Sequence, residues 1–200
     1  MIALLAITDD AAPPPPPVRA VRSGGLSALC APAVEHEVTP DALWRHEELL
    51  EELMRERAIL PVRYGTLVED DDAAARAVAE RRDEFAQGLE RVRGAVELAL
   101  RVEQREPEPP AADVVSGRDY LRAKAARMRT ARRLHERFAA LARAGEVQPG
   151  RELLRAAYLV DRDAVAGFVA LVERVGREHT ELALLCTGPW PPYSFAEGER

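Results

Sequence analysis

Five consecutive prolines at positions 13–17 constrain the start of this 200-residue chain more than any other feature. Proline has no amide hydrogen to donate and holds φ near roughly −65°, so the run is predicted to be an extended, stiff surface connection. Residues 1–8 before it are a short apolar run closed by two aspartates, which is typical of a buried strand. We therefore expect a strand followed by a loop, and prefer this to a proline-rich ligand motif because no partner domain is implied.

Residues up to 104 alternate strand-like runs with two predicted helices. Thr39 suits an N-cap and Pro40 a first helical turn, so a helix is expected from Pro40 to about Arg57. A second helix is expected over residues 73–93, because apolar residues recur there at helical spacing before Gly94. Strand-like runs fall at residues 26–38, 58–68 and 95–102. These elements predict an α+β sandwich of ferredoxin-like character over residues 1–104.

The composition changes at residues 105–117, which are rich in proline, glutamate and alanine and are predicted to link two domains. A long helix is expected over residues 118–143, then a strand near 153–160, a helix capped by Asp161 and a strand at 182–186. The last residues combine prolines with aromatic rings, which predicts an irregular strap whose rings are covered. The second domain, residues 118–200, is thus predicted to be helix-rich with a small sheet.

The long helix carries two apolar faces. Leu121, Ala125 and Met128 share one face, and Leu134, Phe138 and Leu141 share a second. One face could meet the core and the other a partner. We favour packing within the chain for both, because most apolar helix stripes close a core.

Charge and hydropathy argue against nucleic-acid and membrane partners. Lys and Arg total 28 against 34 Asp and Glu, a formal charge of −6, so no general basic field attracts nucleic acid. The basic stretch at residues 118–143 suits a solvated helix face. The first residues lack the features of a signal peptide, and no apolar run approaches the roughly 18 to 20 residues that span a bilayer. We expect a cytoplasmic protein.

The sequence shows no catalytic or cofactor-binding motif. GxxxxGK[ST], GxGxxG and GxSxG are absent, and the four histidines are scattered without metal-ligand spacing. We therefore predict no enzyme, no metal site and no cofactor. Arg63 is the most interesting charge, since an arginine in an apolar strand needs a polar partner or solvent at its head. We favour a structural position for it over ligand binding.

Four stretches, in this order, resemble the gas vesicle protein F/L (GvpF/GvpL) family. They are Gly24-Gly25-Leu26, LPVRYGT at residues 60–66, GAVEL at residues 94–98, and AAYLVD at residues 156–161 with the closing TGPWPPYSF. Tyr64 replaces the commoner phenylalanine of the second stretch. The segment from Gly145 to Leu154 looks shorter than in the family, so a loop or edge strand is expected to be missing.

The resemblance implies a two-domain α+β protein that assists gas vesicle formation, located at the gas vesicle within the cytoplasm. Its implied partners are the small hydrophobic shell protein and other accessory proteins. The motif residues expected to be structural are Pro61, Arg63, Gly65, Tyr158, Asp161, Gly188, Pro189, Pro191 and Pro192. We hypothesise that the long helix and the strap residues Trp190, Tyr193 and Phe195 border a partner surface, although the strap could instead seal its own domain. The alternative function is a small-molecule-binding regulatory module, which a polar pocket around Arg63 would favour.

Overall fold

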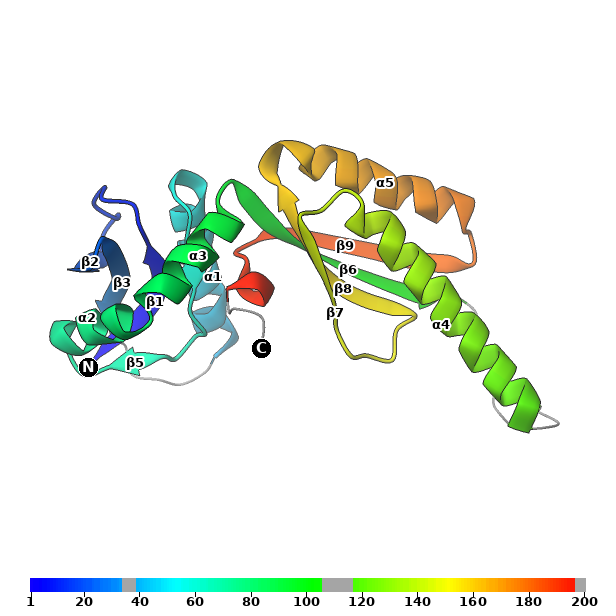
Figure 1. Cartoon of the computed structure of the whole chain (residues 1–200), viewed down its shortest axis with the longest axis horizontal. Helices are drawn as coiled ribbons and strands as arrows, with labels where there is room; N and C mark the ends of the chain where they lie inside the picture. The colour runs from blue at the N-terminus through cyan, green and yellow to red at the C-terminus, as the bar shows by residue number, and fades with distance from the viewer. Residues whose placement is uncertain (34–38, 106–116, 197–200) are drawn as a thin grey trace. The chain divides into compact units, whose positions relative to one another are not determined.

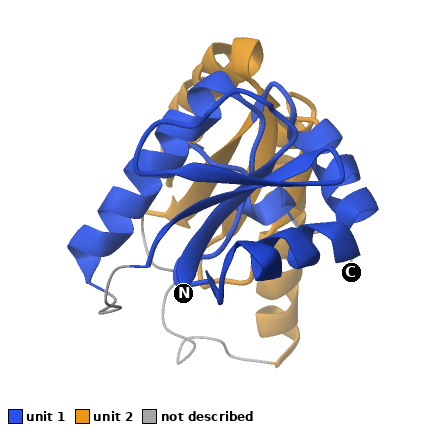
Figure 2. Ribbon diagram, turned by 90° about the vertical axis from the view of Figure 1, so that its left-hand side faces the viewer, with its two compact units in different colours: residues 1–95, 190–200 blue, residues 96–189 orange. Residues whose placement is uncertain are grey.

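The computed structural model describes residues 1–33, 39–105 and 117–196 (Figure 1). The chain forms two compact units, Met1–Ala95 with Trp190–Arg200 and Val96–Pro189 (Figure 2). This division differs from the predicted domains, because residues 96–104 join the second unit and the aromatic strap joins the first. Of the predicted linker, residues 106–116 lie outside the described residues.

Unit 1 is built on a five-stranded sheet with the order β2-β3-β1-β4, in which β5 also pairs with β1. Strand β1 pairs antiparallel with β3, β4 and β5, and β2 pairs antiparallel with β3. The strands are β1 (Ile2–Thr8), β2 (Arg19–Ser23), β3 (Leu26–Pro32), β4 (Leu60–Pro61) and β5 (Leu67–Val68). The strand predicted over residues 1–8 is confirmed. Of the run predicted over residues 26–38, β3 is present and residues 34–38 lie outside the described residues.

Three helices cover this sheet: α1 (Pro40–Glu56), α2 (Asp71–Glu80) and α3 (Arg82–Val92). Helix α1 begins as predicted, since the Thr39 hydroxyl accepts a hydrogen bond from the amide of Ala42 at 3.2 Å. The single helix predicted over residues 73–93 is wrong. Arg81 lies between α2 and α3 with φ −119° and ψ 24°, outside helical geometry.

Helices α1 and α2 lie on opposite faces of the sheet. The side of the sheet that carries Ala3 and Ala31, partners in the β1–β3 register, borders α1. The opposite side carries Arg19 of β2, which pairs with Asp71 in the first turn of α2.

Unit 2 contains β6 (Ala95–Gln104), α4 (Gly117–Ala139), β7 (Ala144–Val147), β8 (Leu154–Asp161), α5 (Val165–Glu178) and β9 (Leu182–Trp190). Its sheet has the order β7-β8-β6-β9. A βαββαβ chain with its first and third strands at the centre is the ferredoxin-like arrangement. The predicted α+β class is confirmed, but the ferredoxin-like half is unit 2. The N-terminal part has three strands before its first helix.

Two C-terminal elements depart from the prediction. Strand β7 lies where a loop or edge strand was expected to be missing, so an edge strand is present there, and it contains Gly145, the predicted end of the long helix. A Cβ atom at Gly145 would stand 3.0 Å from the Tyr158 ring, closer than side chains ordinarily pack, so β7 approaches β8 tightly at this glycine. Strand β9 continues past Cys186 through Gly188 to Trp190, further than predicted.

No helix in the described ranges combines the length and the apolarity that crossing a membrane requires.

Candidate functional site

The second half of α4 packs on the sheet of unit 2. Leu134 and Phe138 are buried there in one cluster with Tyr158 of β8 and Phe168 of α5. The ring centroids of Phe138 and Phe168 lie 5.7 Å apart, and those of Tyr158 and Phe168 lie 5.2 Å apart. This aromatic cluster fixes the direction of α4 on the sheet.

The first half of α4 leaves its apolar face uncovered among the described residues. The exposed fraction is 63% for Leu121 and 64% for Met128, and Tyr120 beside them is 51% exposed. The prediction that this face packs within the chain is therefore wrong for Leu121 and Met128, while Ala125 is half-buried. Of the second predicted face, Leu134 and Phe138 reach the core, whereas Leu141 lies beyond the end of α4 and is 44% exposed. We call Leu121, Ala125 and Met128 the α4 stripe.

Basic side chains surround the α4 stripe. Helix α4 carries Arg118, Arg122, Lys124, Arg127, Arg129, Arg132, Arg133 and Arg137. Its only acidic residues are Asp119 and Glu136, which pair with Arg122 at 3.6 Å and Arg132 at 2.7 Å. Because these pairs are exposed, they contribute little to stability. The helix thus presents an apolar row within a positively charged surface, in a chain whose formal charge is −6.

The aromatic strap packs within unit 1. Phe195 is 2% exposed, and Pro191 and Pro192 are also buried. Tyr193 donates a hydrogen bond from its hydroxyl to Glu47 Oε1 of α1 at 3.0 Å. Trp190 is half-buried at the end of β9. The strap and α4 belong to different units, and the burial of Phe195 accords with a strap that seals its own unit.

The LPVRYGT segment is a tight turn held against β1 at both ends. Val62 donates its amide to the Leu5 carbonyl at 2.8 Å, and Leu4 donates its amide to the Thr66 carbonyl at 2.9 Å. Within the turn the Thr66 amide and hydroxyl both donate to the Arg63 carbonyl, at 3.2 and 2.8 Å. Gly65 has φ +83°, which L side chains rarely adopt. The side chain of Arg63 is exposed.

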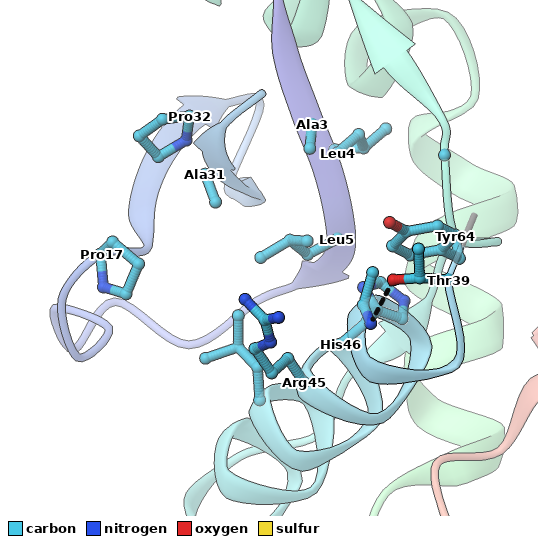
Figure 3. A pocket seen from close by; sticks show the side chains of 13 residues that line it. Ala3, Leu4, Leu5, Pro17, Ala31, Pro32, Thr39, Arg45, His46 and Tyr64 are labelled. Carbon is cyan, nitrogen blue, oxygen red and sulfur yellow. Dashed lines mark hydrogen bonds between the residues drawn. The ribbon is translucent and has the colours of Figure 1, made fainter. Parts of the chain in front are cut away.

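A cavity of about 710 Å³ lies within unit 1, between this turn, β1, β3 and α1 (Figure 3). Its apolar lining includes Ala3, Leu4, Leu5, Pro17, Ala31, Pro32 and Leu49. Polar groups come from Thr39, Arg45 and His46 of the α1 segment and from Tyr64. The pocket that would favour the alternative function is therefore lined by Arg45 and His46, and Arg63 is not among its lining residues. The sequence favoured an exposed or half-buried His46 over a metal ligand, and it predicted neither the burial of this side chain nor the cavity.

His46 is the buried polar group of this cavity. Its exposed fraction is 7%, and its ring packs edge-on against Tyr64 at 5.2 Å between centroids. Burial lowers the pKa of His46, and a hydrogen bond with the Val62 backbone opposes that shift. Its Nε2 atom has no hydrogen-bond partner among the described residues.

The remaining motif residues lie in or beside the sheet of unit 2 and at its end. Tyr158 is fully buried, and its hydroxyl lies 3.0 Å from His135 Nδ1. Burial raises the pKa of Tyr158. Asp161 forms an ion pair with Arg143 and makes no side-chain cap, so the predicted helix cap is wrong; α5 begins only at Val165. Gly188 has φ +120° and a cis bond to Pro189 within β9.

Comparison with known families gives one match that covers nearly the whole chain. The family model described as gas vesicle synthesis protein GvpL/GvpF matches residues 8–133 and 118–197. Gas vesicle protein L of Streptomyces sp. (strain CB03234) is 36% identical over 185 residues, which cover 78% of this chain and 69% of that protein. Gas vesicle protein F of the same strain is 31% identical over 210 residues, which cover 90% of this chain and 88% of that protein.

Two solved structures share the fold. The crystal structure of gas vesicle protein GvpF from Anabaena sp. PCC7120 matches with a TM-score of 0.83 and 16% identity, covering all of this chain and 97% of that chain. The crystal structure of GvpF from Microcystis aeruginosa matches with a TM-score of 0.78 and 15% identity, covering 98% of each chain. At these low sequence identities, the structural similarity shows a shared fold only.

Proposed function

Because the chain belongs to the GvpL/GvpF family of gas vesicle proteins, we propose that it is a non-enzymatic accessory protein of gas vesicle assembly that binds the hydrophobic shell protein. The proposal places it at the gas vesicle within the cell, together with the shell protein and other accessory proteins. The observation that carries the binding step is the exposure of Leu121 and Met128 of the α4 stripe among the described residues.

The α4 stripe has the form of a helix that binds in an apolar groove. Leu121, Ala125 and Met128 occupy positions i, i+4 and i+7, which is the spacing of anchor residues in that mode of recognition. Methionine is flexible and adapts to irregular apolar surfaces. A hydrophobic shell subunit would expose apolar surface before it polymerises, and such surface aggregates unless another protein covers it.

The arginines around the α4 stripe also suit a helix that binds an apolar partner. They keep an exposed apolar row hydrated while the protein is free, because charged side chains interrupt what would be a continuous apolar patch. Their long stems also add apolar contact area at the edge of a bound partner. The charge pattern therefore suits a helix that stays in solution alone and covers a partner on contact.

Binding of purified shell protein by the full chain tests the proposal. The double substitution Leu121→Ser with Met128→Ser removes the apolar anchors and leaves the core of unit 2 intact, because both side chains are exposed. We expect the double variant to lose at least tenfold in affinity. The matched control is Leu185→Ser on β9, an exposed leucine of the same unit that lies off α4. Equal binding by the double variant and the unchanged protein would overturn the proposal.

A further inference from the structure

Helix α1 has an exposed face that carries a large aromatic side chain. Trp44 is 63% exposed there, on the side of the helix away from its buried residues Leu50 and Leu53. Tryptophan is largely buried in most proteins, and it is enriched among the residues that dominate the binding energy of protein interfaces. An exposed tryptophan held on a helix is therefore a suitable anchor for a partner.

Carboxylates surround Trp44. Asp41 precedes it by three residues and Glu48 follows it by four, so both are its neighbours on the helix surface, and Glu52 lies one turn further along. These three carboxylates are exposed and have no ion-pair partner among the described residues. The whole helix carries six carboxylates against two arginines, a formal charge of −4. We call Trp44 with Asp41, Glu48 and Glu52 the acidic α1 face.

Helix α4 has the opposite charge. It carries eight basic residues against two acidic ones, a formal charge of +6. Arg118, Lys124 and Arg129 each lie three or four residues from a member of the α4 stripe, are exposed, and have no ion-pair partner in the part of the chain that the structure describes. Leu121 and Met128 are as exposed as the tryptophan of α1. The two faces are thus opposite in charge, and both expose apolar side chains.

We propose that the protein associates with a second copy of itself, in which the α4 stripe of one copy docks on the acidic α1 face of the other. In this contact Trp44 packs against Leu121 and Met128, while the flanking basic groups lie beside carboxylates. Arginine side chains also interact favourably with the face of a tryptophan ring. A second copy is the occupant because this chain itself supplies both complementary faces. Two copies related by a two-fold axis would make the contact twice.

This contact goes beyond shell binding and does not depend on it. Where both take place they compete, because each uses the α4 stripe. Self-association then covers the apolar row of α4 until a shell subunit displaces the second copy. The attraction between the two faces involves exposed charges, whose interaction is screened beyond about 10 Å at 0.1 M salt. Self-association should therefore weaken as salt is added.

Sedimentation equilibrium of the full chain over a range of protein concentrations tests the contact. We expect the mean mass to rise above that of the monomer as the concentration increases, and to fall again when the salt concentration is raised. Trp44→Ser, at an exposed position, should weaken self-association at least tenfold. Leu185→Ser, which removes an exposed leucine of β9, is the matched control and should leave self-association unchanged.

Charge reversal tests whether these two faces meet each other. Glu48→Lys with Glu52→Lys makes the α1 face basic, and Lys124→Glu with Arg129→Glu makes α4 more acidic. Each double variant alone should associate at least tenfold more weakly, because like charges then face each other. A mixture of the two variants should associate again, since the reversed α1 face of one meets the reversed α4 of the other.

The control for net charge is Glu80→Lys with Glu146→Lys, two exposed carboxylates on α2 and β7. It changes the net charge as much as reversal of the α1 face does, and should associate like the original chain. Glu48→Lys with Glu52→Lys leaves the α4 stripe in place and should bind shell protein normally. Loss of self-association and loss of shell binding are therefore distinguishable.

Three results would overturn the proposal. They are a mean mass that stays that of the monomer at every concentration, self-association that reversal of the α1 face leaves unchanged, and a mixture of the reversed variants that does not associate. Far-ultraviolet circular dichroism checks that each variant folds. If a charge-reversed variant does not fold, Trp44→Ser decides, and self-association as strong as that of Leu185→Ser would then refute the contact.

Discussion

Tyr193 donates a hydrogen bond of 3.0 Å to Glu47 and so ties the C-terminal aromatic strap to α1, 146 positions earlier in the chain. Both side chains of this hydrogen bond are partly buried. Burial raises the pKa of the Glu47 carboxyl, the Tyr193 hydroxyl opposes that shift, and the charge of Glu51 adds to it. The strap is thus part of the packing of unit 1. The charged form of the Glu47 carboxyl is less favourable at this place than it is in water.

Glu47→Gln should stabilise the protein at neutral pH. The raised pKa of Glu47 means that the folded state favours the protonated carboxyl. The stability gained in this way is present below the unfolded pKa of about 4.3 and is lost as the pH rises through the higher folded pKa. Glutamine keeps an oxygen that accepts from Tyr193 and carries no charge. Urea unfolding should show a stabler variant at pH 7 and near equality at pH 4. An unchanged or lower stability at pH 7, or the same gain from the exposed Glu48→Gln, would contradict this account.

Gly65→Ala should destabilise unit 1 by about 1 kcal/mol or more, because the LPVRYGT turn places this residue at φ +83°. No atom crowds a Cβ built there, so the cost is conformational alone. Gly167→Ala in α5 is the control, since that glycine has helical backbone and open space around its Cβ. It should stabilise the protein by roughly 0.5–1 kcal/mol. The two substitutions should shift the thermal midpoint in opposite directions, and shifts of the same sign would refute the argument.

Tyr158→Phe should lower the free energy of unfolding by about 1 kcal/mol, because it removes the hydroxyl that lies 3.0 Å from His135 Nδ1 and keeps the ring. Tyr158→Ala should cost about 3–5 kcal/mol, since it also empties the centre of the aromatic cluster. Urea titrations of both variants measure the difference. Tyr120→Phe removes an exposed hydroxyl and should change nothing measurable. A Tyr158→Phe variant as stable as the original chain would show that the bond contributes nothing.

Patterns within short stretches of sequence predicted the helices and strands whose formation depends mainly on neighbouring residues. The cap at Thr39 and the strand-like run at residues 95–102 predicted a helix start and a strand that the structure confirms. The alternate residues Val96, Leu98, Leu100 and Val102 of that strand are all buried. Strand β2 was missed because its sequence, RAVRS, has little apolar content. The strand pairs with β3 and is partly exposed. Pairing with a neighbour made it a strand, and no local pattern reports that pairing.

Neither the division into units nor the cavity could be predicted from the sequence, because both depend on which distant parts of the chain pack together. Strand β6 belongs with β8 and β9, and the strap with α1, through contacts between distant parts of the chain. The cavity combines β1, β3, α1 and the turn at Tyr64, while Arg45 and His46 stand in a helix crowded with glutamates. The α4 stripe was visible as a helical pattern, but its exposure depends on where the sheet of unit 2 ends.

The central claim is that the α4 stripe makes the contact on which vesicle assembly depends. The most direct measurement is electron microscopy of a vesicle-forming host in which this gene carries Leu121→Ser with Met128→Ser, compared with deletion of the gene and with Leu185→Ser. At equal protein levels, the account predicts that the double variant loses or shrinks its vesicles as the deletion does, while Leu185→Ser leaves them normal. Vesicles of normal number and size in the double variant would contradict it.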